Sequence, residues 1–104
     1  MIRQFDVHRT PTSRGSDDAP FLCVLQSHYL EAIDTVVVAP LIRAAATPTP
    51  SQAVVPVSID GEAFILDTSL ISNIQRRGLG APVGSLLDFE DDIRRALDRL
   101  FTGF

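Results

Sequence analysis

Ser27 and His28, with the acids that follow them, have the residue types of a hydrolytic site. A serine beside a histidine could act as nucleophile and base, with Glu31 or Asp34 orienting the imidazole. Adjacent residues of a strand point to opposite faces, however, so Ser27 and His28 are badly placed to share a proton. We therefore interpret them as a turn or surface pair and expect no catalysis there.

Cys23 and His8 are two further residues that could do chemistry. Cys23 lies in a continuous apolar run, residues 21–25, which favours a small buried hydrophobic residue over a reactive thiol. His8 is expected near the end of an edge strand, exposed to solvent. One cysteine and two histidines without ligand spacing give no zinc pattern, so we predict no metal and no cofactor.

The cations of the chain are all arginines, nine of them against thirteen acids. The net charge of −4 disfavours a phosphate-binding surface, so we expect no direct binding of nucleic acid. Arg76 and Arg77, flanked by Gly78 and Gly80, could form a mobile basic hook for an acidic protein segment or a phosphate. The simpler interpretation, which we favour, is a solvated loop with turn-forming glycines.

The length and composition fit one globular domain over residues 1–104. Hydrophobic residues make up 45% of the chain, and the mean hydropathy is +0.18. No apolar run approaches the roughly 18 residues that span a bilayer, and residues 1–6 lack the apolar core of a signal peptide. With a single cysteine, these features predict a cytoplasmic protein without membrane contact.

Short strands dominate the sequence pattern. Alternating or continuous apolar residues predict strands at 4–9, 21–26, 35–39, 54–59 and 62–66. Pro40 is expected to end the third strand, and Pro56 to place the fourth at a sheet edge or a bulge. Asp60-Gly61 predicts a tight hairpin between the last two strands. Residues 67–74 stay open between a turn and a strand, and residues 76–82 are expected to form a loop.

The clearest element is an amphipathic helix after Asp88, which is a candidate N-cap. Its apolar residues form a single stripe, made of Phe89, Ile93, Ala96, Leu97, Leu100 and Phe101. Acids in the first turn and arginines in the later turns match the helix dipole. Strands followed by one helix favour a mainly β (α+β) fold, a small β-barrel closed by a C-terminal helix.

Residues 100–104 end this helix on two phenylalanines, Phe101 and Phe104, with Gly103 between them. A chain end is normally polar and frayed, because nothing repays the entropy of ordering it. Aromatic side chains there predict one of two things. They either close the domain's own core, or form a tip that docks into another protein, with Gly103 allowing close backbone approach.

In their order and spacing these segments resemble the CcdB family of toxins. The resemblance covers nearly the whole chain and rests on several short matches: Gln4-Phe5-Asp6-Val7, Val24-Leu25-Gln26-Ser27, Val38-Ala39-Pro40-Leu41, Val55-Pro56-Val57-Ser58-Ile59-Asp60-Gly61-Glu62, and residues 90–101 followed by Gly103. It implies an SH3-like barrel like that of CcdB and MazF, a homodimer, and a toxin neutralised by a cognate antitoxin. It also implies poisoning of DNA gyrase through the A subunit by protein contact, without catalysis by the toxin.

The resemblance places the target-binding tip at Phe101, Gly103 and Phe104, with Glu90 as a lesser contact. Loops 9–18 and 41–52 are our candidates for antitoxin contacts, through Arg9, Arg14 and Arg43, because stiff loops beside a barrel edge can accept an added segment.

Two positions of the tip depart from the family pattern. The family has tryptophan where this chain has Thr102, and an aliphatic residue where it has Phe104. Threonine offers no π-face to a target arginine, an interaction worth about 0.5–2 kcal/mol. A CcdB-like scaffold with altered or lost gyrase activity is therefore an alternative. A second alternative is a ribonuclease toxin of the MazF and Kid type, for which Arg14 and Arg43 are candidates.

Overall fold

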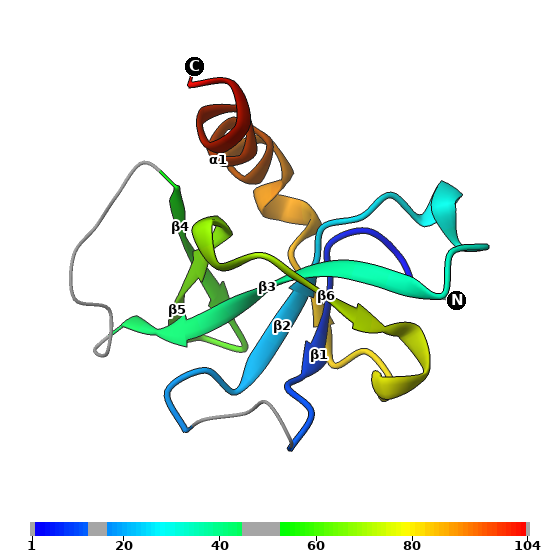
Figure 1. The fold of residues 1–104 in the computed structure, drawn as a ribbon. Coiled ribbons are helices and arrows are strands. Elements are labelled where there is room, and N and C mark those ends of the chain that lie inside the picture. The colour runs from blue at the N-terminus through cyan, green and yellow to red at the C-terminus, as the bar shows by residue number, and fades with distance from the viewer. Residues whose placement is uncertain (1, 13–16, 45–52, 104) are drawn as a thin grey trace.

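A computed structural model describes residues 2–12, 17–44 and 53–103. Its strands are β1 (Asp6–Arg9), β2 (Phe21–Val24), β3 (Thr35–Arg43), β4 (Val54–Ile59), β5 (Glu62–Asp67), β6 (Ser72–Gln75) and β7 (Gly84–Ser85). They form one antiparallel sheet in the order β4-β5-β3-β2-β1-β7, with β6 paired to β3. Helix α1 (Glu90–Thr102) lies beside β4 (Figure 1). The prediction of a mainly β, barrel-like fold with a C-terminal helix is confirmed, and the sheet forms a half-barrel.

Short 3₁₀ turns connect these elements. They are η1 (His28–Leu30), η3 (Thr68–Leu70), η4 (Arg76–Gly78) and η5 (Leu87–Phe89). The open segment 67–74 is thus a turn followed by strand β6. None of the helices in the described ranges is long and apolar enough to cross a membrane.

Strand β3 does not end at Pro40, so that prediction was wrong. Pro40 lies opposite Leu22 of β2, and the amide of Leu25 donates to Val37 O at 2.9 Å, which fixes the hydrogen-bond phase of this pair of strands. In this phase the nitrogen of Pro40 points away from β2. On that side β6 pairs β3 only as far as Val38, and β5 begins at Leu41. The missing N–H therefore falls where β3 changes partners, and no ladder bond is lost.

The hairpin between β4 and β5 forms as the sequence predicts. Asp60 and Gly61 both have positive φ, 50° and 82°, as a type I′ turn requires. β4 is an edge strand. The bond from the amide of Thr68 to Ala53 O, 2.9 Å, fixes the phase so that the nitrogen of Pro56 faces the open edge. Pro56 removes a donor from that edge and so discourages further strand pairing.

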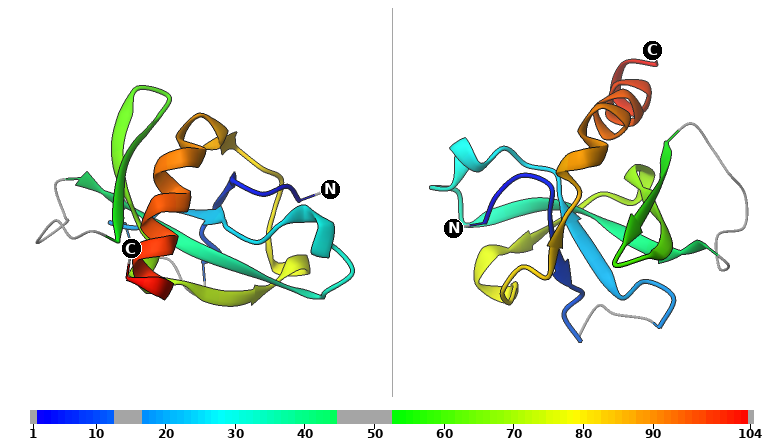
Figure 2. Two further views of the ribbon diagram at one scale, coloured as in Figure 1. Left: turned by 90° about the horizontal axis from the view of Figure 1, so that it is seen from above. Right: turned by 180° about the vertical axis from the view of Figure 1, so that it is seen from behind.

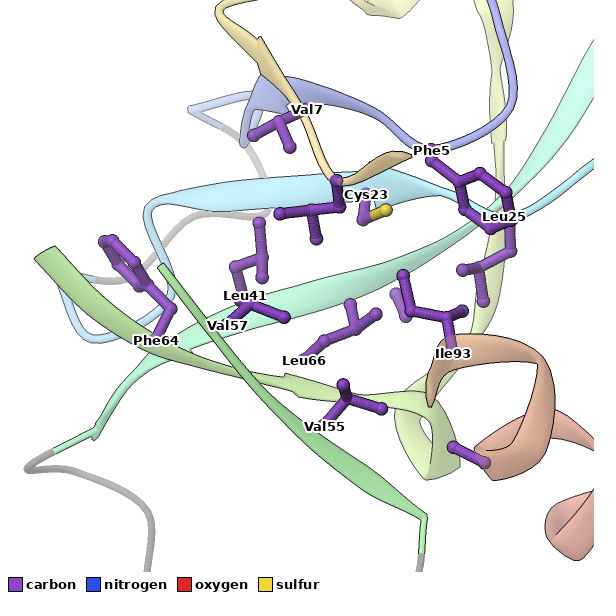
Figure 3. Packing of buried hydrophobic residues seen from close by; sticks show 13 residues of the cluster. Phe5, Val7, Cys23, Leu25, Leu41, Val55, Val57, Phe64, Leu66 and Ile93 are labelled. Carbon is purple, nitrogen blue, oxygen red and sulfur yellow. The ribbon is translucent and has the colours of Figure 1, made fainter. Parts of the chain in front are cut away.

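The main core fills the barrel between the curved sheet and α1 (Figure 3). Phe5, Leu41, Phe64 and Leu66 are almost fully buried in it, and Ile93 of α1 is inserted among the strand residues. Asp88 does not cap α1. It lies in η5, and the residue at the N-cap is Phe89, which makes no side-chain capping bond. Burial of the apolar stripe, and not a cap, fixes the helix on the sheet.

A second, smaller core lies on the other face of the sheet, and His8 is buried beside it, not exposed as predicted. Its Nδ1–H donates to Gly80 O at 2.9 Å, and its Nε2 has no partner in the part of the chain that the structure describes. The segment after η4 carries Gly80 to the histidine, and Leu79 packs on the smaller core. The strand that we expected at an edge is therefore covered on this face.

Candidate functional site

The end of helix α1 carries the predicted target-binding residues. Ile93 and Ala96 are fully buried, but the apolar stripe leaves the core one turn later. Leu100 is 36% exposed and Phe101 67% exposed. The side chain of Phe101 therefore extends into solvent and does not close the core of the domain.

The backbone of this end stays ordered through Gly103. Gly103 has a φ of 80°, and its amide donates to Arg99 O at 3.0 Å, which ends the helix with a left-handed residue. The hydroxyl of Thr102 donates to Asp98 O at 2.6 Å. Apart from its chain neighbours and the backbone of the helix itself, no described atom lies within 4 Å of the position where a side chain on Gly103 would begin. The helix thus presents Phe101 on a fixed backbone, and Phe104 lies outside the described residues.

Glu90 lies at the other end of the same helix face. Phe101 follows Glu90 by eleven positions, which corresponds to about three turns and about 16 Å along the axis. The carboxylate of Glu90 pairs with Arg94 at 2.7 Å, and the guanidinium of Arg94 lies 5.6 Å from the centre of the Phe5 ring. The two ends of the predicted target surface are therefore joined by one face of α1.

The arginines predicted to contact an antitoxin have different surroundings. Arg9 is exposed at the end of β1. Arg43 is hydrogen-bonded to the neighbouring loop. Its amide donates to Asp18 O at 2.8 Å, and its Nε donates to Asp17 O at 3.0 Å. Arg43 also pairs with Glu62 and lies 5.7 Å from the centre of the Phe64 ring. Arg14 and residues 45–52 lie outside the described residues.

The connection between β2 and β3 forms a second exposed apolar surface, which the sequence did not indicate. Tyr29 is 88% exposed, and Leu30 and Ile33 are each nearly half exposed. Ser27 orders the start of this turn, because its hydroxyl accepts from the amide of Tyr29 at 3.2 Å. Ser27 therefore acts as a cap for η1.

Arg76 holds this turn from a distant part of the chain. Its Nε donates to Ile33 O at 2.6 Å and its Nη2 to Leu30 O at 3.1 Å, while its amide donates to Asp34 O at 2.9 Å. We call residues 27–34 the Arg76-bound turn. Arg76 is thus a fixed structural residue and not part of a mobile hook.

A surface cleft of about 290 Å³ lies between this turn and η4. Asp34, Gln75, Arg76 and Arg77 line it. Gln75 Oε1 accepts from Arg77 Nε at 2.8 Å, which orients the guanidinium of Arg77. The only signal for this cleft in the sequence is the pair of adjacent arginines.

The buried thiol of Cys23 is a poor nucleophile. Burial raises the pKa of Cys23 to about 12, and the nearby charge of Asp6 adds to the increase. The thiolate, which is the nucleophilic form, is therefore scarce at neutral pH. This agrees with the prediction of a small buried hydrophobic residue.

The fold is similar to that of solved toxins. The Mycobacterium tuberculosis toxin MazF-mt6 has a TM-score of 0.74 and 19% identity, over 92% of this chain and 95% of that one. An endoribonuclease in complex with its cognate antitoxin, from a mycobacterial species, has a TM-score of 0.73 and 14% identity, over 94% and 92%. An Mtb toxin has a TM-score of 0.68 and 22% identity, over 80% and 92%. At these identities the similarity concerns the fold.

No curated protein matches the chain in sequence. The family model described as CcdB protein matches residues 4–103. This match runs from the first strand of the barrel through the capped end of α1, and it includes every described residue of the predicted tip. It confirms the resemblance found in the short motifs. The chain therefore belongs to the CcdB protein family.

Proposed function

We propose that this chain is the toxin of a toxin–antitoxin pair and that it poisons DNA gyrase by binding the A subunit. The observation that carries the proposal is the ordered, exposed end of α1 on a chain of the CcdB family. The proposed contacts are Phe101, Gly103 and Phe104, with Glu90 as a lesser contact. The toxin would act by trapping gyrase on cut DNA, and breaks no bond itself.

The geometry of Phe101 suits an interface anchor. The residue is 67% exposed, and the backbone that carries it is already fixed by the bond from Gly103 to Arg99. Because the backbone is already ordered, binding would cost only the entropy of the two rotatable bonds of the side chain. Buried aromatic anchors of this kind commonly dominate the binding energy of an interface.

Thr102 changes what the tip can offer a partner. Its hydroxyl is bound to Asp98 O within the helix, so this position contributes a methyl group and no ring. The aromatic area of the proposed tip comes instead from Phe101 and Phe104. We therefore expect gyrase binding to depend on these two rings more than on position 102.

We further propose a cytoplasmic homodimer that brings two tips together. Exposed Leu70 on η3 and Leu100 on α1 lie on elements that pack against each other. They are our candidates for apolar contacts between protomers. The cognate antitoxin is proposed to bind along Arg9, Arg14 and Arg43, where Arg43 joins the loop at Asp17 to the sheet.

The test is a DNA cleavage assay with purified gyrase, ATP, supercoiled plasmid and this protein. Linear DNA should accumulate only when gyrase is present, and replacement of Phe101 by alanine should reduce it strongly. Tyr29→Ala is the matched control, because it removes an exposed aromatic side chain from another surface. Absence of cleavage at micromolar protein would reject gyrase poisoning and favour the scaffold with lost activity.

The same preparation can be incubated with RNA alone. Cleavage of RNA by the isolated protein, lost on replacement of Arg43, would replace our proposal by a ribonuclease. We expect intact RNA, because the chain is acidic overall and Arg43 is already bound to Glu62 and to Asp17 O.

A further inference from the structure

The cleft between η4 and the Arg76-bound turn is separate from the proposed tip. In Figure 1 the yellow turn η4 lies at the lower right and the red end of α1 at the top, and the two stay apart in both views of Figure 2. One lining residue of the cleft, Gln75, is the last residue of β6 and pairs with Thr35, the first residue of β3. Whatever binds there can do so while the tip is exposed.

The walls of this cleft are held in place before any ligand binds. Arg76 is bound to two carbonyl groups of the turn through its side chain. Gln75 holds Arg77 by its Nε. The two terminal amino groups of Arg77 make no contact with an acceptor in the described part of the chain, so they remain able to donate.

This arrangement distinguishes Arg77 from Arg43. The guanidinium of Arg43 is bound to Glu62 and to Asp17 O, so its charge is already paired. In Arg77, among the described residues, only Nε is bound, to Gln75, and the two terminal amino groups of the planar guanidinium remain able to donate. A guanidinium in this state binds a carboxylate through two parallel hydrogen bonds.

The charge of the cleft selects the class of anion. Two arginines and Asp34 line it, which leaves about one net positive charge. Asp34 repels any anion, but it would repel a phosphate group, which carries about −1.5 to −2 at neutral pH, more strongly than a singly charged carboxylate. A single carboxylate matches this balance, and the amide of an extended peptide could donate to Asp34.

We infer that the Arg76–Arg77 cleft binds an acidic side chain of the cognate antitoxin. This inference rests on the proposed function, since it requires that the chain has an antitoxin partner. It places one antitoxin anchor on the side of the barrel away from the tip. An antitoxin that also reaches Arg9 and Arg43 would therefore extend around the sheet.

The first experiment is calorimetric titration of the cognate antitoxin into wild-type protein and into Arg77→Gln. We expect the substitution to weaken binding about fivefold, as for a partly exposed pair with a charged partner. Arg95→Gln is the matched control, because it removes the same charge from an exposed site on α1. Equal losses in the two variants would show only a general charge effect and overturn the inference.

A second measurement works without the antitoxin. The protein, labelled with ¹⁵N, is titrated with the methylamide of N-acetyl-glutamate, which carries one side-chain carboxylate, and in parallel with inorganic phosphate. The Nε–H signal of Arg77 should shift with saturation by the carboxylate, while that of Arg95 stays unchanged. A stronger response to phosphate, or no response at Arg77, would overturn the inference.

These outcomes separate the two levels of the proposal. No binding of any candidate antitoxin to the wild type would reject the proposed function. Strong binding that ignores Arg77→Gln would reject only the cleft. Proper folding of the variant is checked by its urea unfolding midpoint, which should stay near that of the wild type because Arg77 is exposed.

Discussion

The end of α1 and the Arg76-bound turn both expose large apolar side chains, but they are ordered in different ways. Phe101 lies on a helix whose end is closed by a bond between residues four apart, Gly103 and Arg99. Tyr29 lies on a turn that is held by Arg76, 43 residues away from Ile33 in the chain. The first surface is fixed locally and the second by long-range contacts.

This difference has a consequence for how each surface can be disturbed. The helix end keeps its conformation as long as α1 remains on the sheet, so its side chains can be changed without loss of fold. The turn depends on one distant guanidinium, so a single substitution far away in sequence can release it. Mutations at the two surfaces should therefore separate function from local order.

The largest effect is expected from deletion of Gly103 and Phe104. Gyrase-dependent DNA cleavage should disappear, because two of the three proposed tip residues and the capping bond to Arg99 are lost, while the core beneath Ile93 and Ala96 is untouched. Circular dichroism and the urea midpoint should stay close to wild type. A truncated protein that fails to fold would show that the tail belongs to the core after all.

Loss of the buried anchor of α1 should instead act on stability. Ile93→Ala is expected to lower the free energy of unfolding by about 2–5 kcal/mol, because the side chain is fully buried. Phe101→Ala, which changes an exposed side chain of the same helix, should lower the free energy of unfolding by less than about 1 kcal/mol. Urea unfolding of both variants measures the contrast, and similar losses in the two would contradict the assignment of Phe101 to the surface.

Most of the locally ordered parts of the molecule are predicted well from the sequence, although the expected N-cap at Asp88 was not formed. The apolar stripe identified α1, and Asp60-Gly61 identified the hairpin and its turn. The glycine at the helix end was recognised, although its capping bond to Arg99 was not. These features follow from residue spacing and from backbone preferences that act within a few residues.

The parts that the sequence could not predict depend on distant partners. Pro40 continues a strand because β3 changes partners beside it. His8 is buried because residues near Gly80 return to cover the sheet. Arg76 is bound because its guanidinium reaches two carbonyls more than 40 residues earlier. Spacing along the chain carries no information about such contacts.

Release of the Arg76-bound turn should have an intermediate effect. Arg76→Met keeps much of the apolar stem but removes two side-chain hydrogen bonds to carbonyls, which are each worth about 0.5–1.5 kcal/mol. Urea unfolding should report a loss of about 1–3 kcal/mol on this basis. Hydrogen exchange at the amide of Ile33, which donates to Leu30 O, should become faster. Arg77→Met is the control, and it should leave that amide protected.

The smallest expected effect is a gain at position 102. Thr102→Trp removes the hydroxyl bond to Asp98 O and adds a broad ring beside Phe101, which can stack on a cation for about 0.5–2 kcal/mol. Binding to the gyrase A subunit should therefore strengthen several-fold, as measured by surface plasmon resonance. Thr102→Val is the control, because it also removes the hydroxyl but adds no ring, and it should leave the affinity near that of wild type. A tryptophan variant that binds no better than the valine variant would show that the tip meets its target through Phe101 and Phe104 alone, in a docking mode different from the one that the family resemblance implies.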